Sequence, residues 1–391
     1  MAAKQLVKIG GLVLVLAILG GCNRGDDEGV RITTPPAPAG NNAAPSLPPP
    51  SSGPPGASYA DVVSRATPAV VTIHSQMRSR QPQQFPFMDD PFFRRFFGER
   101  SPQQPPAERR REGLGSGVIV TQDGYILTNH HVIDGADQIR VDLIDGRTFE
   151  ARVIGADPPS DLAVLKVNAG GLPTLTLGNS DQTRIGDVVL AIGNPLGVGQ
   201  TVTMGIISAK GRQTGLSNGS FEDFLQTDAP INRGNSGGAL VSTNSELVGI
   251  NSQILSPSGG SIGLGFAIPS NMARIVMEQL INTGQVRRGQ LGIVVLKIPS
   301  EEATELGVTQ GPGVVVYQVQ PGSAADRAGL RRGDVITALN GTAINEPNTF
   351  RNMIASNQPG TEVTLRVRRD GNERDVRARL GEFQPQAERQ R

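Results

Sequence analysis

The chain has 391 residues, with 37 lysines and arginines against 36 aspartates and glutamates, and a formal net charge of +1. This balance of charge gives no sign of a nucleic-acid partner. A chain of this length corresponds to about two to three domains. Its 49 glycines, interspersed with short runs of Val, Ile and Thr, favour an all-β architecture with many turns.

The N-terminal segment predicts export. Residues 1–8 carry two lysines and no acid, and the apolar run 9–21 is shorter than the about 20 residues of a membrane-spanning helix. We therefore interpret residues 1–21 as a signal peptide. The run ends at Leu-Gly-Gly-Cys22, which resembles the lipobox of bacterial lipoproteins and implies a lipid anchor on Cys22. A plain signal peptide or an uncleaved anchor is the alternative. Cys22 is the single cysteine, so no internal disulfide is expected.

Two segments have the composition of linkers or loops. Residues 22–57 are rich in Pro, Gly, Ala, Asn and Ser, cannot bury enough apolar surface to fold, and are expected to be a disordered tether. Residues 76–112 are rich in Gln, Pro and Arg but also hold half of the chain's 12 phenylalanines. This second segment is either a disordered insertion or a long loop whose aromatic side chains dock on another surface.

Short apolar runs alternate with turn signals from residue 113 to residue 268. Asp123-Gly124 and Asp145-Gly146 each separate two apolar runs, as in β-hairpins. Closely spaced antiparallel strands of this kind predict a sandwich or barrel. The spacing of Met272, Val276 and Leu280 then predicts a helix that is capped by Ser270 or Asn271 and stopped by Gly284. Further strands are expected at 162–167, 188–192, 201–208, 247–251 and 264–268.

A second, smaller α+β unit follows. Strands are expected at 314–319, 335–339 and 363–367, with helices at 324–328 and 349–354. Residues 381–391 read as a polar tail.

The stretch Arg-Gly-Asn-Ser236-Gly-Gly-Ala places one hydroxyl among glycines. It is either an ordinary surface loop or the loop of a nucleophilic serine. A nucleophilic serine needs a base and a group that orients the base. The chain has three histidines, His74, His130 and His131. If the last two continue a strand, only one of them can face a cleft. Asp161 stands at the start of an apolar strand, either as a turn residue or as the orienting acid.

The order His131, Asp161, Ser236 is that of chymotrypsin-type enzymes. Together with the stretches 115–132, 161–167, 231–241 and 263–272, it resembles the HtrA (Deg) family of serine proteases. The resemblance extends over about residues 58–380. It implies an all-β chymotrypsin/trypsin-like double β-barrel protease domain over 58–283, with 76–112 as a long regulatory loop, and a small α+β PDZ domain over 284–380.

The resemblance also implies roles for individual residues. His131 rather than His130 is the base, Asp161 orients it, and Ser236 is the nucleophile. Backbone N–H groups of Gly234 and Ser236 stabilise the oxyanion, in a hole formed by Gly234, Asn235 and Ser236. The specificity pocket has no acid and predicts cleavage after small or medium apolar residues; it is lined by Ile231, Leu255 and Ile262.

The second unit resembles a PDZ domain in two places. Residues 328–336 match its middle, and Gln290, Leu291, Gly292 and Ile293 match the loop that binds a peptide's terminal carboxylate. A packing domain without a ligand is the alternative.

The expected function is hydrolysis of unfolded or damaged exported proteins in the periplasm or cell envelope, as part of protein quality control. By resemblance the protein forms a homotrimer, and loops 193–200, 211–220 and 253–262 control activation. A catalytically silent, lipid-tethered chaperone or peptide-binding protein is the alternative. No metal or other cofactor is expected, because the sequence lacks a His-Glu-x-x-His pattern and a Gly-Lys-Ser/Thr loop.

Overall fold

The computed structural model describes residues 58–77, 111–194, 199–214, 221–232, 234–254 and 260–384. The predictions for the signal peptide, for Cys22 and the tether, and for most of the Phe-rich segment lie outside these ranges. Within them, no helix is long and apolar enough to cross a membrane.

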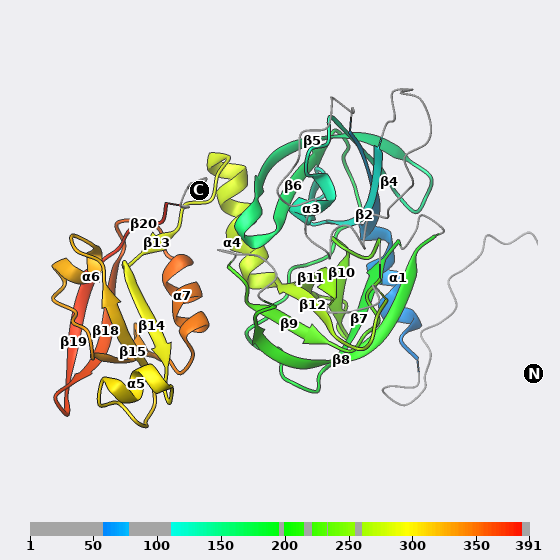
Figure 1. Ribbon diagram of the computed structural model, residues 1–391. Coiled ribbons are helices and arrows are strands. Elements are labelled where there is room, and N and C mark those ends of the chain that lie inside the picture. Colours follow the sequence, from blue (N-terminus) through cyan, green and yellow to red (C-terminus); the bar gives the residue numbers. More distant parts are fainter. Residues whose placement is uncertain are drawn as a thin grey trace, which may run out of the picture. The chain divides into compact units, whose positions relative to one another are not determined.

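Six antiparallel strands close into a first barrel in the order β1-β2-β3-β6-β5-β4 (Figure 1). Side chains alternate between core and solvent along β4. In β4, Ile139 and Val141 are buried while Gln138 and Arg140 are exposed. The strands are β1 (Val70–Met77), β2 (Arg111–Ile119), β3 (Tyr125–Thr128), β4 (Gln138–Asp142), β5 (Thr148–Asp157) and β6 (Leu162–Val167).

A second closed barrel has the order β10-β11-β12-β9-β8-β7. The pair of barrels confirms the predicted chymotrypsin/trypsin-like fold. Two strands were not predicted, β9 and β10, and each has only four residues. The strands are β7 (Val188–Gly193), β8 (Thr201–Arg212), β9 (Phe224–Thr227), β10 (Ala239–Ser242), β11 (Leu247–Ile254) and β12 (Gly265–Pro269).

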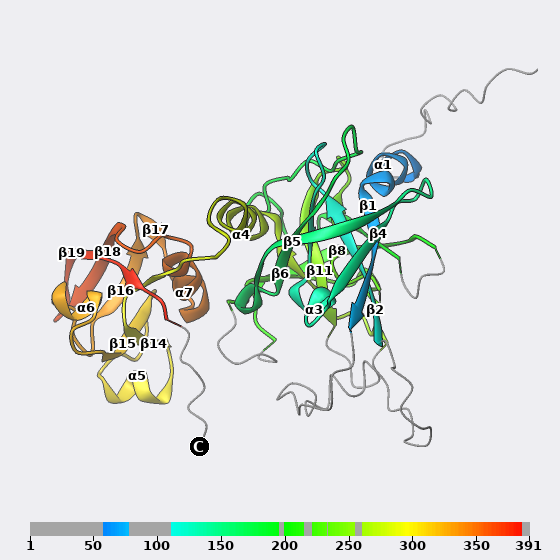
Figure 2. The ribbon, with the colours of Figure 1, turned by 90° about the horizontal axis from the view of Figure 1, so that it is seen from above.

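Short helices precede or connect the strands of the first barrel. Helices α1 (Ala60–Ala66) and η1 (Thr67–Ala69) precede β1, α3 (His130–Ile133) joins β3 to β4, and η3 (Pro158–Ser160) joins β5 to β6. In both Figure 1 and Figure 2, α3 lies beside β2 and β6, which it contacts. Two of these helices, α3 and η3, directly adjoin predicted site residues.

The longer helix α4 (Ser270–Thr283) follows the last strand of the second barrel. Its apolar face, formed by Ala273, Val276 and Leu280, packs into the same hydrophobic core as side chains of both barrels. The predicted stop at Gly284 is confirmed, since this residue adopts a left-handed φ of 74°. The predicted cap is wrong, because Pro269 occupies the N-cap position and the Ser270 hydroxyl donates instead to the carbonyl of Gly178, at 2.9 Å.

The second, smaller unit contains a sheet with the order β14-β15-β16-β18-β19, which leaves β14 at one edge. Strand β17 pairs with β16, and β13 pairs with β20. The predicted strands 314–319 and 335–339 are confirmed residue for residue. Helix α7 lies beside β14 (Figure 1). The elements are β13 (Gly289–Gln290), β14 (Ile293–Lys297), α5 (Glu301–Glu305), β15 (Val314–Val319), α6 (Ala324–Arg327), β16 (Val335–Leu339), β17 (Thr342–Ala343), α7 (Pro347–Ala355), β18 (Glu362–Arg369), β19 (Asn372–Arg379) and β20 (Gly381–Glu382).

Candidate active site

Asp161 lies at the junction between η3 and β6. Its φ of 54° is left-handed, and this turn directs the carboxylate out of the strand register. Three groups bond to that carboxylate. The backbone N–H of His131 donates to Oδ1 at 3.0 Å, the ring Nδ1 of His131 lies 2.8 Å from Oδ2, and the Ser252 hydroxyl donates to Oδ2 at 2.9 Å. The carboxylate is therefore held in place by groups from the helix α3 and the strand β11.

His131 belongs to the helix α3 rather than to a strand, which corrects the strand interpretation of the two adjacent histidines. Its ring Nδ1 contacts both carboxylate oxygens of Asp161, and within the described residues the ring bonds to no other group. Nε2 is therefore the nitrogen that can exchange a proton with a substrate or nucleophile. His130 takes a different partner, with its Nε2 3.7 Å from Asp134.

The two charged groups shift each other's pKa. Burial opposes the charged imidazolium, but the charge and hydrogen bond of Asp161 outweigh it, so the pKa of His131 is raised above its ordinary 6.5. For Asp161, burial would raise the pKa; the charge and hydrogen bonds of His131, with the hydrogen bond from Ser252, lower it below its ordinary 3.8. The acid therefore stays ionised at neutral pH and stabilises a protonated imidazole.

Ser236 lies in the loop between β9 and β10 and is only 6% exposed. Its backbone carbonyl accepts a hydrogen bond from Ser116 N–H on β2, at 2.8 Å, so the loop is attached to the first barrel. The next residue, Gly237, donates to the carbonyl of Asn251 at 2.8 Å. Asn251 is followed directly by Ser252, which bonds to Asp161. The structure thus brings the loop of Ser236 and the His131–Asp161 pair to adjacent residues of β11.

Two backbone N–H groups beside Ser236 have no partner in the described residues, those of Gly234 and of Ser236 itself. The N–H of Asn235, between them, donates to the carbonyl of Asn232 at 3.0 Å and is engaged. Gly234 has a φ of 91°, a conformation that favours glycine. A pair of unpaired donors flanking a serine is the arrangement that stabilises an oxyanion. Among the described residues, the N–H groups of Gly234 and Ser236 thus fit the prediction of two oxyanion donors, while the N–H of Asn235 is bonded within the loop.

The predicted specificity pocket is described in part. Ile231 is 1% exposed and packs in an apolar cluster of the second barrel, where its Cδ1 lies 3.0 Å from the position of a Cβ added at Gly265. Ile262 is 57% exposed. Leu255 lies outside the described residues. The lining of this pocket by the three side chains stays a prediction.

Two serines of the site were not singled out from the sequence. Ser252 donates to the carboxylate of Asp161, and Ser116 contacts the loop of Ser236 through both its backbone and its side chain. Serine is common in loops and strands, and neither residue stands in a pattern that indicates its long-range partner. Among the described residues, no cluster of three or more His, Cys, Asp or Glu side chains could hold a metal ion.

The predicted carboxylate loop joins β13 to β14. The carbonyl of Leu291 accepts from Ala325 N–H and that of Gly292 from Gln320 N–H, both at 2.9 Å. The N–H groups of Leu291 and Gly292 have no partner in the described part of the chain. Gly292 has a φ of 76°, and a Cβ there would lie 2.4 Å from Ser323 Cβ. The loop thus presents two amide donors and can only be built with glycine at position 292.

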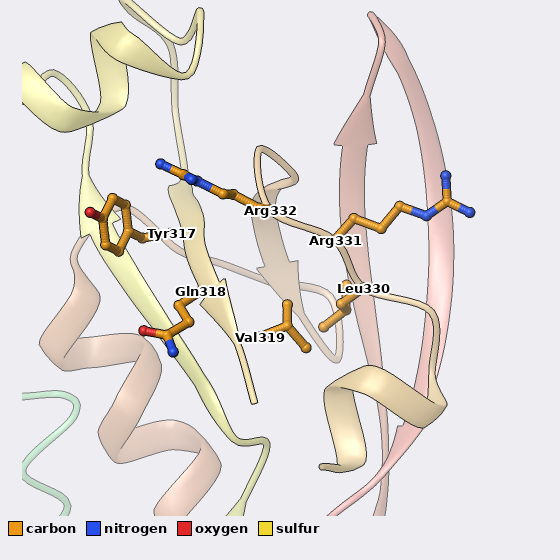
Figure 3. Close-up of a pocket in the computed structure, with 6 residues that line it drawn as sticks. All are labelled: Tyr317, Gln318, Val319, Leu330, Arg331 and Arg332. Carbon is orange, nitrogen blue, oxygen red and sulfur yellow. The ribbon is translucent and has the colours of Figure 1, made fainter. Parts of the chain in front are cut away.

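A separate cavity of about 580 Å³ opens in the PDZ domain between β15 and the residues 330–332. Figure 3 shows the Arg332 side chain reaching toward Tyr317, whose ring centroid lies 5.0 Å from the guanidinium, while Arg331 points the opposite way. None of the four residues of the predicted carboxylate loop lines this cavity. It is therefore distinct from the predicted peptide site.

Comparison with known families defines the class of protein. Residues 115–250 match the trypsin-like peptidase domain family, and residues 285–380 match the PDZ domain family. The first match contains His131, Asp161 and Ser236, and the second contains the loop 290–293. The fold and the matches together define a trypsin-like serine peptidase that carries a PDZ domain.

Individual relatives narrow the class to one family. The probable periplasmic serine protease do/HhoA-like of Haemophilus influenzae is 46% identical over 331 residues, covering 83% of this chain and 71% of that protein. The periplasmic pH-dependent serine endoprotease DegQ of Escherichia coli is 46% identical over 325 residues, covering 83% of this chain and 70% of that protein. The chain therefore belongs to the HtrA family of serine endoproteases, as the sequence motifs predicted. The names of these relatives support a periplasmic location.

Solved structures agree with this assignment. An HtrA-type protease AlgW with a decapeptide is 49% identical, has a TM-score of 0.66, and covers 84% of this chain and 99% of that one. A structure of the same HtrA-type protease with a tripeptide has a TM-score of 0.67 at 45% identity. These neighbours support peptides or proteins as substrates, and they do not favour the alternative of a catalytically silent binding protein.

Proposed function

We propose that the protein is a periplasmic endopeptidase that cleaves peptide bonds with His131, Asp161 and Ser236. One observation carries the proposal. An imidazole paired through Nδ1 with a half-buried carboxylate lies beside the same stretch of β11 as the loop of Ser236, in which the N–H groups of Gly234 and Ser236 have no partner among the described residues. Each of these three features has a separate task in acyl transfer.

The mechanism follows from the direction of the bonds. The Ser236 hydroxyl attacks the substrate carbonyl while Nε2 of His131 takes its proton. The imidazolium that forms is stabilised by the Asp161 carboxylate, which also fixes the tautomer. The N–H groups of Gly234 and Ser236 donate to the new oxyanion. His131 then gives the proton to the leaving amine, and water hydrolyses the acyl-enzyme by the same steps.

The proposed substrates are unfolded or damaged exported proteins, because their apolar residues are accessible. The proposed specificity pocket is formed by Ile231, Leu255 and Ile262. No acidic side chain stands among these residues, so we expect cleavage after residues such as Val or Ala rather than after Lys or Arg.

The proposed role of the PDZ domain is to bind the C-terminal end of a substrate or signal peptide. Two features support it. The N–H groups of Leu291 and Gly292 are available for a terminal carboxylate, and β14, which follows them, is an edge strand to which an extended peptide can add. Gln290 and Ile293 flank these donors as the ends of β13 and β14.

The proposal also covers the oligomeric state of the protein and its attachment to a membrane. By resemblance to the family, the protein acts as a homotrimer, is tethered to a membrane through a lipid on Cys22, and uses the segment 76–112 as a regulatory loop. The proposed domains are the protease domain 58–283 and the PDZ domain 284–380, preceded by the signal peptide and tether. If chromatography with light scattering gives the mass of a monomer, the proposal of a trimer is refuted.

The test is digestion of an unfolded model protein with the cleavage sites mapped by mass spectrometry. Wild type is expected to cut after small or medium apolar residues and to be labelled by a serine-directed phosphonate. Ser236→Ala is expected to do neither. Labelling and cleavage that persist in Ser236→Ala would refute the nucleophile, and cuts mainly after basic residues would refute the pocket.

A further inference from the structure

A buried serine on β2 links the first barrel to the loop of the nucleophile. Ser116 is 0% exposed. Its hydroxyl lies 2.5 Å from the carbonyl oxygen of Gly234 and 2.9 Å from the backbone nitrogen of Asn194. A hydroxyl has one proton to donate. Because the Asn194 N–H donates to the oxygen of Ser116, the proton of Ser116 is directed to the Gly234 carbonyl.

Asn194, which orients the hydroxyl, is itself held. Its side-chain Nδ2 donates to Thr72 Oγ1 on β1 at 2.5 Å, and its Oδ1 accepts from Gly199 N–H at 3.0 Å. The direction of the Ser116 proton is therefore set by groups that are fixed in both barrels. This matters because a rotating hydroxyl would hold the carbonyl only part of the time.

The peptide group between Gly234 and Asn235 is bonded on both edges. Its carbonyl accepts from the Ser116 hydroxyl, and its N–H donates to the carbonyl of Asn232. Beyond it, the Ser236 carbonyl accepts from the backbone N–H of Ser116 at 2.8 Å. Ser116 thus holds the carbonyls of both residues whose N–H groups are the proposed oxyanion donors.

We propose that Ser116 is a positioning residue that keeps the N–H groups of Gly234 and Ser236 directed at the oxyanion. Glycine turns easily about its backbone bonds because it has no Cβ. At Gly234, with a φ of 91°, that freedom permits the required conformation but does not select it. The hydrogen bond from Ser116 supplies the selection. Ser116 acts through Gly234 and does not touch the substrate. This inference rests on the proposed roles of His131, Asp161 and Ser236.

The test compares Ser116→Ala with the matched control Ser270→Ala. Both serines are 0% exposed and donate to a backbone carbonyl, but Ser270 donates to Gly178 instead of the nucleophile loop. Both variants lose a bond to a buried backbone carbonyl, and Ser116→Ala also removes the acceptor of the Asn194 N–H. The assays are hydrolysis of a fluorogenic peptide with valine before the scissile bond, inhibition by the corresponding peptide aldehyde, and thermal unfolding.

We expect Ser116→Ala to lower kcat by about 10- to 100-fold with little change in KM, because complete loss of one oxyanion donor costs about 10²–10³ in kcat. The aldehyde forms a tetrahedral adduct whose oxygen occupies the same hole. Its affinity should fall by the same factor as kcat/KM. Ser270→Ala loses one hydrogen bond instead of two, so it should lower thermal stability by a smaller amount, and it should leave both kinetic readouts within twofold of wild type.

The inference is overturned if Ser116→Ala keeps kcat and aldehyde affinity within twofold of wild type while Ser236→Ala is inactive. Activity in Ser236→Ala would instead overturn the proposed function. If Ser116→Ala does not fold, Ser116→Cys takes its place under the same criteria, since a thiol keeps most of the shape but is a weak donor.

Discussion

Gly237 follows the nucleophile directly, and a single added methyl group there tests the packing behind Ser236. The backbone φ of Gly237 is 81°. A Cβ on this residue would lie 2.1 Å from the carbonyl oxygen of Ser116 and 2.3 Å from Thr128 Oγ1. Those two atoms are hydrogen-bonded to each other at 2.7 Å, and both residues are 0% exposed. Gly237→Ala must therefore displace backbone and break a buried hydrogen bond.

The loss of folding free energy expected for Gly237→Ala has two parts. A left-handed backbone costs a non-glycine residue about 1–2 kcal/mol, and overpacking of a filled core costs about 1–3 kcal/mol. The sum for Gly237→Ala, about 2–5 kcal/mol, is a large part of the about 5–15 kcal/mol that stabilises a typical domain. Gly146 isolates the first part, because its φ is 87° and no atom lies within 4 Å of an added Cβ. Gly146→Ala is therefore expected to cost only about 1–2 kcal/mol.

The assay is denaturant unfolding of wild type and both variants, together with hydrolysis of an unfolded protein. We expect a clearly lower midpoint and a loss of most activity for Gly237→Ala. Gly146→Ala should show a smaller shift of midpoint and full activity. If the two variants are equally stable and equally active, the close approach of the loop to Ser116 and Thr128 is not present, and the reasoning about the site's glycines is refuted.

Three further predictions concern charge, hydrogen bonding and backbone conformation. The raised pKa of His131 predicts that kcat/KM of the wild type increases with pH through a midpoint above 6.5, as the base loses its proton. Asp161→Asn should move this midpoint downward and lower kcat about 10⁴-fold. An unmoved midpoint in the pH profile of the variant would contradict the pairing of His131 with Asp161. Ser252→Ala removes one hydrogen bond at 2.9 Å from the Asp161 carboxylate and should lower kcat roughly tenfold in steady-state assays, whereas an unchanged kcat would show that the bond is dispensable. Gly292→Ala should weaken binding of a C-terminal decapeptide, measured by fluorescence polarisation, by about tenfold or more, because of its φ of 76°, and should leave phosphonate labelling intact.

Local patterns predicted much of the fold. Turn residues such as Asp145-Gly146 and the helical spacing of Val276 and Leu280 act over a few positions, and the structure has a hairpin and a helix there. Strands of four residues, such as β9 and β10, are too short to show a period. The two adjacent histidines were misplaced on a strand because one helical turn, His130–Ile133, carries no sequence signal of its own.

The same distinction between local patterns and long-range contacts applies to the residues of the site. The family motifs marked the positions 131, 161 and 236, because a base, an acid and a nucleophile each stand in a distinctive stretch. The residues that hold these three in place do not stand in distinctive stretches. Ser252 contacts Asp161 across 91 positions, and Ser116 contacts Gly234 across 118. A serine at such a distance is indistinguishable from any other until the strands are placed together.

The long-range hydrogen bonds explain how a glycine-rich loop can serve as part of the active site. Glycine at 234, 237 and 238 removes the side chains that would restrain the loop or collide with it; a Cβ at Gly238, for example, would lie 2.3 Å from the carbonyl of Ile192. The resulting freedom must then be removed by tertiary hydrogen bonds from neighbouring strands. In this protein such bonds come from Ser116 on β2 and Asn251 on β11, and they add to the loop's own turn bond between Asn235 and Asn232. The orientation of the oxyanion donors therefore depends on the docking of the two barrels as well as on the loop.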